Sequence, residues 1–237
     1  MKKIIIVGAS SGMGRELAIL YAKNNCLVGV TGRRSNLLEE LHQQFPKNIF
    51  TQCFDNTKDD IEKNLSALVS QLGGLDLMII SSGVGYLNPS LDATVEKQTL
   101  DLNVTAWTAV TDFSFNFFTE KKSGHLAAIT SIAAIRGEGR APAYHASKAY
   151  QAIYLEGLRK RSFMLKLNIK VTDIQPGFVK TAMPRSYKRL GEASIEKAAK
   201  QIFSAIESKK KKVYITKRWW VVAQVMKVLP DWIYHRL

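Results

Sequence analysis

Apolar residues in this chain gather in seven short and almost uninterrupted runs, separated by longer stretches with helical spacing. Runs that do not alternate with polar residues are buried on both faces, which is typical of strands in a parallel sheet. Strands that alternate with helices predict βαβ units in a doubly wound α/β fold, with helices on both faces of the sheet. We expect strands at residues 3–7, 27–31, 49–54, 77–81, 126–130, 169–175 and 212–215. Helices are expected at residues 13–24, 35–45, 59–72, 94–118, 142–164 and 194–208.

The same pattern runs along the chain without a linker, a repeat or a low-complexity tract. Residues 1–216 are therefore expected to form one domain, including a variable loop at 178–193 that helps to form a substrate site. That loop contains Met183, Arg185, Tyr187, Lys188 and Arg189. Residues 217–237 form an atypical tail.

Composition is that of a soluble globular protein, because 46% of the 237 residues are hydrophobic and 23% are charged. The chain has no apolar run near the roughly 20 residues that a membrane-spanning helix needs. Its apolar N-terminus is too short for a signal peptide and enters a glycine-rich turn, so we expect a cytoplasmic protein. The 34 basic and 20 acidic residues give a net charge of +14. Such an excess suits nucleic acid, an anionic membrane surface or phosphorylated small molecules.

The two cysteines and four histidines lack the spacing of metal ligands, so no metal site is expected. Cys26 and Cys53 both lie in apolar surroundings along the sequence. We expect both to pack in the core of a protein from a reducing compartment.

A glycine-rich turn follows the first expected strand and precedes the first expected helix. It reads Gly8-Ala9-Ser10-Ser11-Gly12-Met13-Gly14. Glycines allow the backbone to turn tightly and to approach a pyrophosphate, which the N–H groups at the start of the helix then bind. A strand-to-helix turn can also contain a glycine for steric reasons alone, but three glycines in this context favour a Rossmann-like nucleotide site.

About 20 residues further on, folds that bind NAD usually have an acidic residue that accepts from the ribose 2′-OH. This chain instead has Arg33 and Arg34. An arginine pairs with a 2′-phosphate, which a carboxylate would repel. The position therefore favours NADP over NAD, with Arg33 as the preferred ligand of the two. The alternative is a solvated arginine pair at the start of a helix.

Tyr144 and Lys148 lie four residues apart on the helix expected at 142–164. Residues at this spacing project from one face of a helix. A fixed positive charge beside a phenol brings its pKa down from about 10 towards a range useful for proton transfer. By itself the pair arises often by chance on surface helices. His145 projects about 100° away from Tyr144, and we assign it no chemistry.

The combination of motifs is more specific. Over roughly residues 3–216 the chain resembles the short-chain dehydrogenase/reductase family in the order and intervals of its motifs. These are Gly8-x3-Gly12-x-Gly14, Asn103, Ser131, Tyr144-x3-Lys148 and Pro176-Gly177. The chain departs from the family in having Val7 where a threonine is common and Ile80-Ser81-Ser82-Gly83 where Asn-Asn-Ala-Gly is usual.

The resemblance implies roles for these residues. Tyr144 would be the general acid/base, Lys148 would assist it and hold the nicotinamide ribose, and Ser131 would bond the substrate oxygen. Asn103 would anchor a water in a proton relay from Lys148 to solvent. The implied cofactor residues also include Asp55 and Asn56 near the adenine, Ser81, Ser82 and Gly83 after the fourth strand, and Pro176, Gly177, Val179 and Thr181 over the nicotinamide.

These features predict an NADP-dependent oxidoreductase that transfers a hydride between NADPH and a carbonyl or alcohol substrate, in the direction of ketone reduction. The alternative is a non-catalytic sensor or regulatory protein that binds NADP(H). A nucleic-acid-binding protein is disfavoured, because no recognised binding module appears and the basic residues are spread over many segments.

Two expected helices carry more apolar residues than packing on one sheet requires. The helix at 94–118 includes Trp107 and several phenylalanines, and the helix at 142–164 includes Tyr150, Ile153 and Tyr154. A deep core would explain them, but together with the resemblance they favour a homodimer or homotetramer.

The tail has aromatic and aliphatic residues around a narrow polar stripe of Lys217, Gln224, Lys227 and Asp231. Tryptophan, tyrosine and flanking cations suit the surface of a membrane, and the lysine run at 209–212 would add attraction to anionic lipid. Peripheral membrane contact is thus one interpretation. A lid over the substrate cleft and an oligomer contact are the others. The tail also resembles those of family members that reduce lipid-like substrates, and this resemblance implies a lipid-like ketone.

Overall fold

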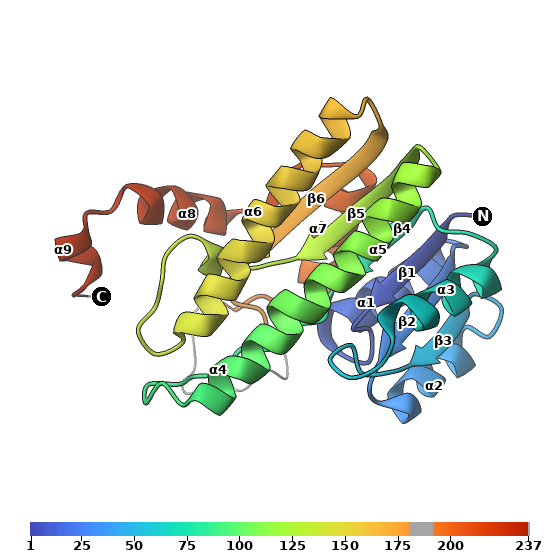
Figure 1. Cartoon of the computed structure of the whole chain (residues 1–237), viewed down its shortest axis with the longest axis horizontal. Coiled ribbons are helices and arrows are strands. Elements are labelled where there is room, and N and C mark those ends of the chain that lie inside the picture. The colour runs from blue at the N-terminus through green and yellow to red at the C-terminus, as the bar shows by residue number, and fades with distance from the viewer. Residues whose placement is uncertain (181–191, 237) are drawn as a thin grey trace.

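The computed structural model describes residues 1–180 and 192–236. Seven parallel strands form one sheet in the order β3-β2-β1-β4-β5-β6-β7. Figure 1 shows the part of this order that runs from β3 to β6. The strands are β1 (Lys3–Val7), β2 (Leu27–Gly32), β3 (Ile49–Cys53), β4 (Leu77–Ile80), β5 (Ser123–Ile129), β6 (Asn168–Pro176) and β7 (Lys212–Ile215). The prediction of a doubly wound parallel sheet in a single domain is confirmed.

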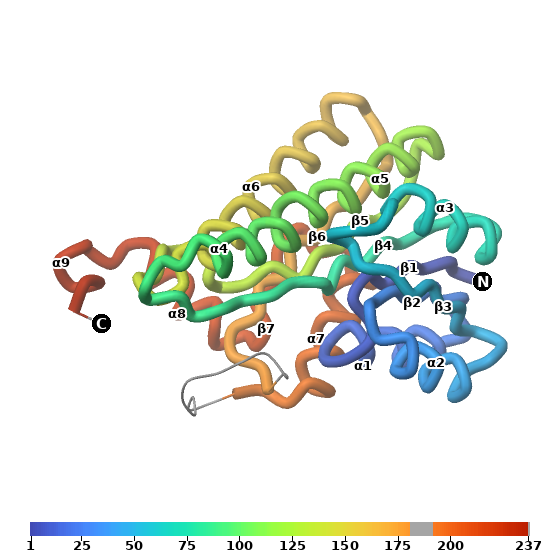
Figure 2. The backbone as a smooth tube through the Cα atoms, turned by 60° about the horizontal axis from the view of Figure 1, so that its bottom comes forward, coloured from blue at the N-terminus to red at the C-terminus, as the bar shows by residue number. Residues whose placement is uncertain are grey.

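Helices cover both faces of this sheet (Figure 2). One face has α1 (Gly12–Lys23), α2 (Ser35–Gln44) and α7 (Ile195–Glu207). The other face has α3 (Ile61–Leu72), α5 (Trp107–Glu120) and α6 (Pro142–Met164). The remaining helices are α4 (Ala93–Leu100), α8 (Arg218–Val228) and α9 (Asp231–Tyr234).

The first strand explains why the sheet needs both layers. Successive side chains of a strand point to opposite faces, and Ile4 and Ile6 join the core under α1, α2 and α7. Ile5 and Val7 join the core under α3, α5 and α6. All four side chains are inaccessible to solvent. A run of β-branched residues without polar interruption is therefore stable only when both faces are covered.

Two expectations need correction. Cys53 is exposed, because it ends the edge strand β3, and only Cys26 is buried. The helix expected at 94–118 consists of α4 and α5 joined by a π-helical turn at Asp101–Ala106. A π turn inserts one extra residue per turn, which the spacing of apolar residues does not reveal.

The strand order reverses direction between β1 and β4, and ligands of such sheets bind outside the carboxyl ends of the strands at this point. The predicted site residues follow those ends: Gly8 after β1, Ser81 after β4 and Ser131 after β5. The tail helices α8 and α9 extend away from the sheet at one end of the molecule (Figure 1 and Figure 2). Within 1–180 and 192–236, no helix is both long enough and apolar enough to cross a membrane.

Candidate active site

The glycine-rich turn forms a close contact between the end of β1 and the start of α1. A Cβ at Gly14 would lie 2.3 Å from the carbonyl oxygen of Gly8, so only glycine fits there. Gly12 has φ +63°, in the left-handed region that favours glycine. The Ser11 side chain does not cap α1. The N–H groups of its first turn are thus left to an outside acceptor, as a bound diphosphate requires.

Arg34 is attached to this turn. Its Nε and Nη2 donate to Ser10 Oγ at 3.2 and 2.8 Å, and its Nη2 donates to Ser11 Oγ at 2.6 Å. Arg33 is 65% exposed, and its Nη1 lies 3.8 Å from a carboxylate oxygen of Asp55. Partial burial acts to raise the pKa of Asp55, but hydrogen bonds from Thr57 and the Arg33 charge keep it below its ordinary value. Both arginines therefore lie beside the glycine-rich turn, with Arg34 in direct contact.

The segment after β4 lies beside the same turn. Ser81 N donates to Val7 O at 2.8 Å. Ser82 N lies 2.6 Å from the position of a Cβ on Gly8. The hydroxyl of Ser82 is buried and has no hydrogen-bond partner among the residues that the structure describes. A buried hydroxyl without a hydrogen-bond partner is costly in free energy. The position of Ser82 therefore fits a bound polar ligand. The serines that replace the usual asparagine and alanine leave the turn after β4 intact.

Asn103 lies in the π-helical turn and is fully buried. Its Oδ1 accepts from Val84 N at 2.9 Å, and its Nδ2 donates to Val84 O at 2.7 Å and to Ser147 Oγ at 3.1 Å. The side chain thus ties the segment after β4 to α6. These hydrogen bonds hold protein segments together, and the water-anchoring role that the family resemblance implies for Asn103 stays a prediction.

Lys148 places its ammonium group in the protein interior, and 4% of the residue is exposed to solvent. Its Nζ donates to Gln151 Oε1 at 3.0 Å and to Ile129 O at 3.4 Å. Burial lowers the pKa of Lys148 to about 8, and the negative charge of Asp173 acts in the opposite direction. Lys148 is therefore poised to change charge close to neutral pH.

Asp173 is itself fully buried in β6, and burial raises its pKa although hydrogen bonds and nearby cations act against this. Its oxygens accept from Thr130 Oγ1 at 2.6 Å and from Gln175 Nε2 at 2.8 Å. Thr130 immediately precedes Ser131. The carboxylate therefore fixes the backbone that presents Ser131 while it also acts electrostatically on Lys148.

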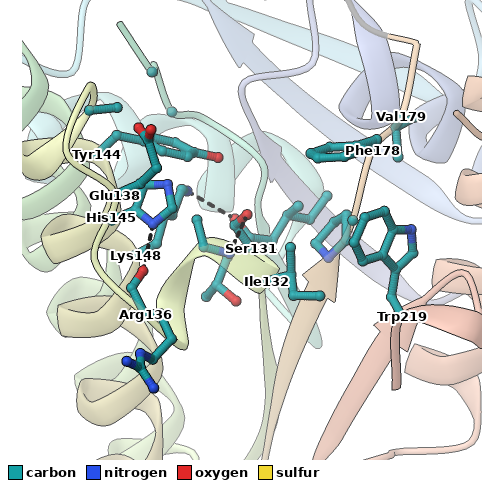
Figure 3. Close-up of a pocket in the computed structure, with 18 of the residues that line it drawn as sticks. Ser131, Ile132, Arg136, Glu138, Tyr144, His145, Lys148, Phe178, Val179 and Trp219 are labelled. Atoms are coloured by element: carbon teal, nitrogen blue, oxygen red, sulfur yellow. Dashed lines mark hydrogen bonds between the residues drawn. The ribbon is translucent and has the colours of Figure 1, made fainter. Parts of the chain in front are cut away.

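Tyr144, Lys148 and Ser131 line one cavity of about 400 Å³. Figure 3 shows Tyr144 and Lys148 on one side of it, Phe178 and Trp219 on the other side and Ser131 between them. The Nζ of Lys148 lies 5.9 Å from the centre of the Tyr144 ring. A hydroxyl, a phenol and an ammonium that meet at one cavity can bind and protonate an oxygen atom.

The tail supplies the opposite wall of this cavity through Trp219, Val222, Met226 and Tyr234. Trp219 packs on Phe178 with ring centres 4.8 Å apart. It also packs directly on Gly177, where a Cβ would lie 2.0 Å from an indole atom. The tail therefore closes the cleft on one face.

Arg136 holds the tail in this place. Its Nη1 donates to Leu229 O at 2.9 Å, and its Nη2 pairs with Asp231 Oδ1 at 2.6 Å. The guanidinium also lies 4.4 Å from the centre of the Tyr234 ring, and the Tyr234 hydroxyl donates to Gly137 O. One arginine just after Ser131 thus connects the cleft to the tail.

The cavity brings together about half of the residues predicted from the sequence. Those that line it are Met13, Ser81, Gly83, Ser131, Tyr144, Lys148, Pro176, Gly177 and Val179. The other described residues of the predicted set do not line the cavity. They are Gly8, Ser10, Ser11, Gly12, Gly14, Arg33, Arg34, Ser82, Asp55, Asn56 and Asn103. Thr181 and the loop residues Met183, Arg185, Tyr187, Lys188 and Arg189 lie outside the described residues.

The sequence reasoning missed several residues of the wall. Gly85 packs under Tyr144, where a Cβ would lie 2.8 Å from a ring carbon. His145, to which we assigned no chemistry, also lines the cavity, and its Nδ1 bonds with Arg136 O at 2.6 Å. Because a carbonyl only accepts, this nitrogen carries the proton. The motif Gly83-x-Gly85 was a usable signal, whereas no local pattern indicates that Arg136 contacts the tail.

Comparison with known proteins gives consistent results. The model of the short chain dehydrogenase family matches residues 2–190. An uncharacterized oxidoreductase of Myxococcus xanthus is 34% identical over 185 residues, which are 76% of this chain and 72% of that protein. Dehydrogenase/reductase SDR family member 7B of Mus musculus is 28% identical over 239 residues, which are 90% of this chain and 72% of that protein.

Solved structures share the fold. A short chain dehydrogenase from Burkholderia cenocepacia in complex with NADP has a TM-score of 0.83 at 19% identity, over 100% of this chain and 99% of that one. A 3-ketoacyl-(acyl-carrier-protein) reductase from Brucella melitensis complexed with NADH has a TM-score of 0.81 at 19% identity, over 90% and 96% of the two chains. The chain belongs to the short-chain dehydrogenase/reductase family of oxidoreductases, as its motifs predicted.

The buried ammonium makes stability depend on pH. Lys148 has a folded-state pKa of about 8, below its ordinary value of 10.5. The unfolded chain therefore binds more protons between these values, and stability rises with pH in this range. Compared with Lys148→Met, the wild type should gain unfolding free energy by up to about 1.4 kcal/mol per pH unit above pH 8. Urea unfolding of both proteins at several pH values measures the difference, and parallel curves would contradict the assignment.

Proposed function

We propose that this protein is an NADP(H)-dependent oxidoreductase that reduces the carbonyl group of an apolar ketone. The observation that carries the proposal is the meeting of Tyr144, Lys148 and Ser131 at one cavity, at the carboxyl ends of the strands and beside a turn suited to a diphosphate. The family supports a small-molecule redox substrate, and relatives of similar fold bind NADP or NADH.

A bound nicotinamide supplies the hydride that reduces the carbonyl carbon. Ser131 donates a hydrogen bond to the substrate oxygen, and Tyr144 gives its phenolic proton to the same oxygen as negative charge develops there. Lys148 supports the loss of that proton, because a positive charge close to a phenol stabilises the phenolate. The reverse reaction, alcohol oxidation, uses the same groups.

The dinucleotide would extend from this cavity along the carboxyl ends of the strands. Gly8, Gly12 and Gly14 would approach its diphosphate, with Met13, Ser10 and Ser11 beside them, and Asp55 and Asn56 would border the adenine. Ser81, Ser82 and Gly83 would support it from β4, while Pro176, Gly177, Val179 and Thr181 would cover the nicotinamide. The described residues of this set lie at or after the carboxyl ends of β1, β3, β4 and β6, or at the start of α1.

Arg33 and Arg34 support NADP as the preferred cofactor. Arg34 donates hydrogen bonds to the serines of the glycine-rich turn, and the largely exposed Arg33 forms a 3.8 Å ion pair with Asp55. A 2′-phosphate between the two guanidinium groups would replace that weak pair with charge-assisted hydrogen bonds.

The substrate class follows from the cleft walls. Ile132, Phe178, Trp219, Val222 and Met226 make most of the lining near the reacting groups apolar. Burying an alkyl or aromatic group against them is favourable by about 25 cal/mol per Å². A ketone with a sizeable apolar substituent therefore fits better than a polar sugar.

The exposed apolar face of α6 supports a homodimer or homotetramer, whereas Trp107, Phe115 and Phe118 of α5 are buried in the core. Ile153 is 70% exposed in the middle of α6, and Tyr150 and Tyr154 stack beside it with ring centres 5.6 Å apart. Such a face is apolar enough to associate with a second copy of the chain.

Replacement of the phenol tests the redox proposal. Tyr144→Phe should lower NADPH-dependent reduction of a ketone by about 10²- to 10⁴-fold, because the proton donor is lost. Its affinity for NADPH should stay unchanged, as measured by fluorescence titration. Tyr150→Phe, on the same helix but bonded to Thr108 at 2.9 Å, is the matched control. Binding of NADPH without turnover of any ketone in a broad panel would instead favour the sensor.

Cofactor preference is tested at the arginines. Arg33→Ala should weaken NADPH binding by about 10- to 100-fold while it leaves NADH binding nearly unchanged, since only NADPH has the extra phosphate. Arg34→Ala should weaken both, because Arg34 supports the turn itself. Equal losses for NADPH and NADH in Arg33→Ala would assign the 2′-phosphate to another group.

A further inference from the structure

The tail has two faces, and one of them lines the cleft while the other faces solvent. Trp219 and Met226 line the cleft and Ala223 is buried. The opposite side of α8 and the start of α9 carry large apolar side chains in solvent. These are Trp220, Val221, Val225, Val228 and Trp232, with exposed fractions between 50% and 81%. We call these five residues the outer face.

Cations border the outer face. At 100° per residue, Arg218 and Lys227 lie on opposite edges of the α8 part of the outer face, with Lys217 at its start. From Ser208 to Pro230 the sequence has no acidic residue and seven basic ones. Four of these seven basic residues form the lysine run Lys209–Lys212, which precedes Lys217 and α8.

We propose that the outer face binds the surface of an anionic lipid bilayer. Tryptophan and valine between cationic edges match the interface, where indoles lie at the headgroups and basic side chains meet anionic lipid. A second copy of the chain fits less well. A two-fold contact would bring the basic edges of both copies together, and the acidic residue nearest by, Asp231, is already paired with Arg136.

The inner side of the same helix forms a wall of the cleft, so a docked tail would bring the substrate site close to the lipid. If the proposed function holds, this location would supply ketones that dissolve in the bilayer. The docking itself does not depend on turnover, and its test needs neither cofactor nor ketone.

Sedimentation of the full chain with vesicles tests the docking. The wild type should bind vesicles of phosphatidylcholine with phosphatidylglycerol, and much less those of phosphatidylcholine alone. Trp220→Gln/Val228→Gln should lower the partition coefficient by about tenfold or more, because both side chains are exposed and apolar. Phe163→Gln/Met164→Gln is the matched control, since these exposed apolar residues end α6, outside the tail.

Three results would overturn the proposal. One is that the wild type sediments with neither kind of vesicle, and another is that the two double variants lose binding equally. A third is that Trp220→Gln/Val228→Gln lowers the molar mass in light scattering, which would mean that a second copy covers the outer face. If Trp220→Gln/Val228→Gln still reduces the ketone, the proposed function is independent of whether the outer face binds vesicles.

A second inference concerns Gln151, one helical turn after Lys148 and fully buried. Its Oε1 accepts from Lys148 Nζ at 3.0 Å, and its Nε2 donates to Asn103 O at 2.8 Å. The amide thus bridges the ammonium and the π-helical turn. We infer that Gln151 is a positioning residue that orients the Lys148 ammonium and leaves its charge free to change.

The Gln151 amide is a neutral partner, and this affects how firmly Lys148 holds its proton. Among the residues that the structure describes, the carboxyl group of Asp173 acts on the ammonium from β6, and the titratable phenol of Tyr144 lies on the same helix as Lys148. An amide oxygen orients the ammonium without fixing its charge, whereas a carboxylate at the same place would hold the proton more firmly.

Two near-isosteric variants test this role without any turnover. Gln151→Glu should move the pH at which Lys148 titrates upward, and Gln151→Met should move it downward. That pH is read from the difference in unfolding free energy between each variant and its Lys148→Met double variant. A merely structural glutamine would lower stability at every pH without these opposite shifts, and that result would overturn the inference.

Discussion

The charge of one buried ammonium organises this site. Lys148 lies almost out of reach of water, and its surroundings stabilise it with an amide, a backbone carbonyl and the field of a more distant carboxylate. A directly paired carboxylate would neutralise the charge that a neighbouring phenol requires. In the proposed function, burial without such a pair leaves Lys148 free to act on Tyr144, at a free-energy cost that the rest of the fold has to offset.

The surroundings of that charge come from four different parts of the chain. The π-helical turn brings Asn103 against the segment after β4, Gln151 joins this turn to Lys148, and Asp173 fixes Thr130 before Ser131. Each of these polar groups is buried and hydrogen-bonded. Such networks are stable only when nearly every member is satisfied, which explains why the reacting groups rest on strand ends and a helix instead of on loops.

The two walls of the cleft come from different parts of the fold. Strand ends and α6 present the polar groups, whereas the tail adds Trp219 and its apolar neighbours. Arg136 couples the two sides through contacts with Leu229 and Asp231. The polar wall and the apolar wall of the cleft are therefore supplied by different segments of the chain.

Local patterns in the sequence were enough for the strands, the glycine-rich turn and the pair Tyr144 and Lys148. Burial on both faces demands uninterrupted apolar runs, tight turns demand glycine, and helical spacing aligns side chains four residues apart. Tertiary structure alone decided the rest: the π-helical turn, the exposure of Cys53, the bridge made by Gln151 and the contact of Arg136 with the tail. These depend on contacts between residues far apart in the chain, and such contacts leave no periodic trace in the sequence.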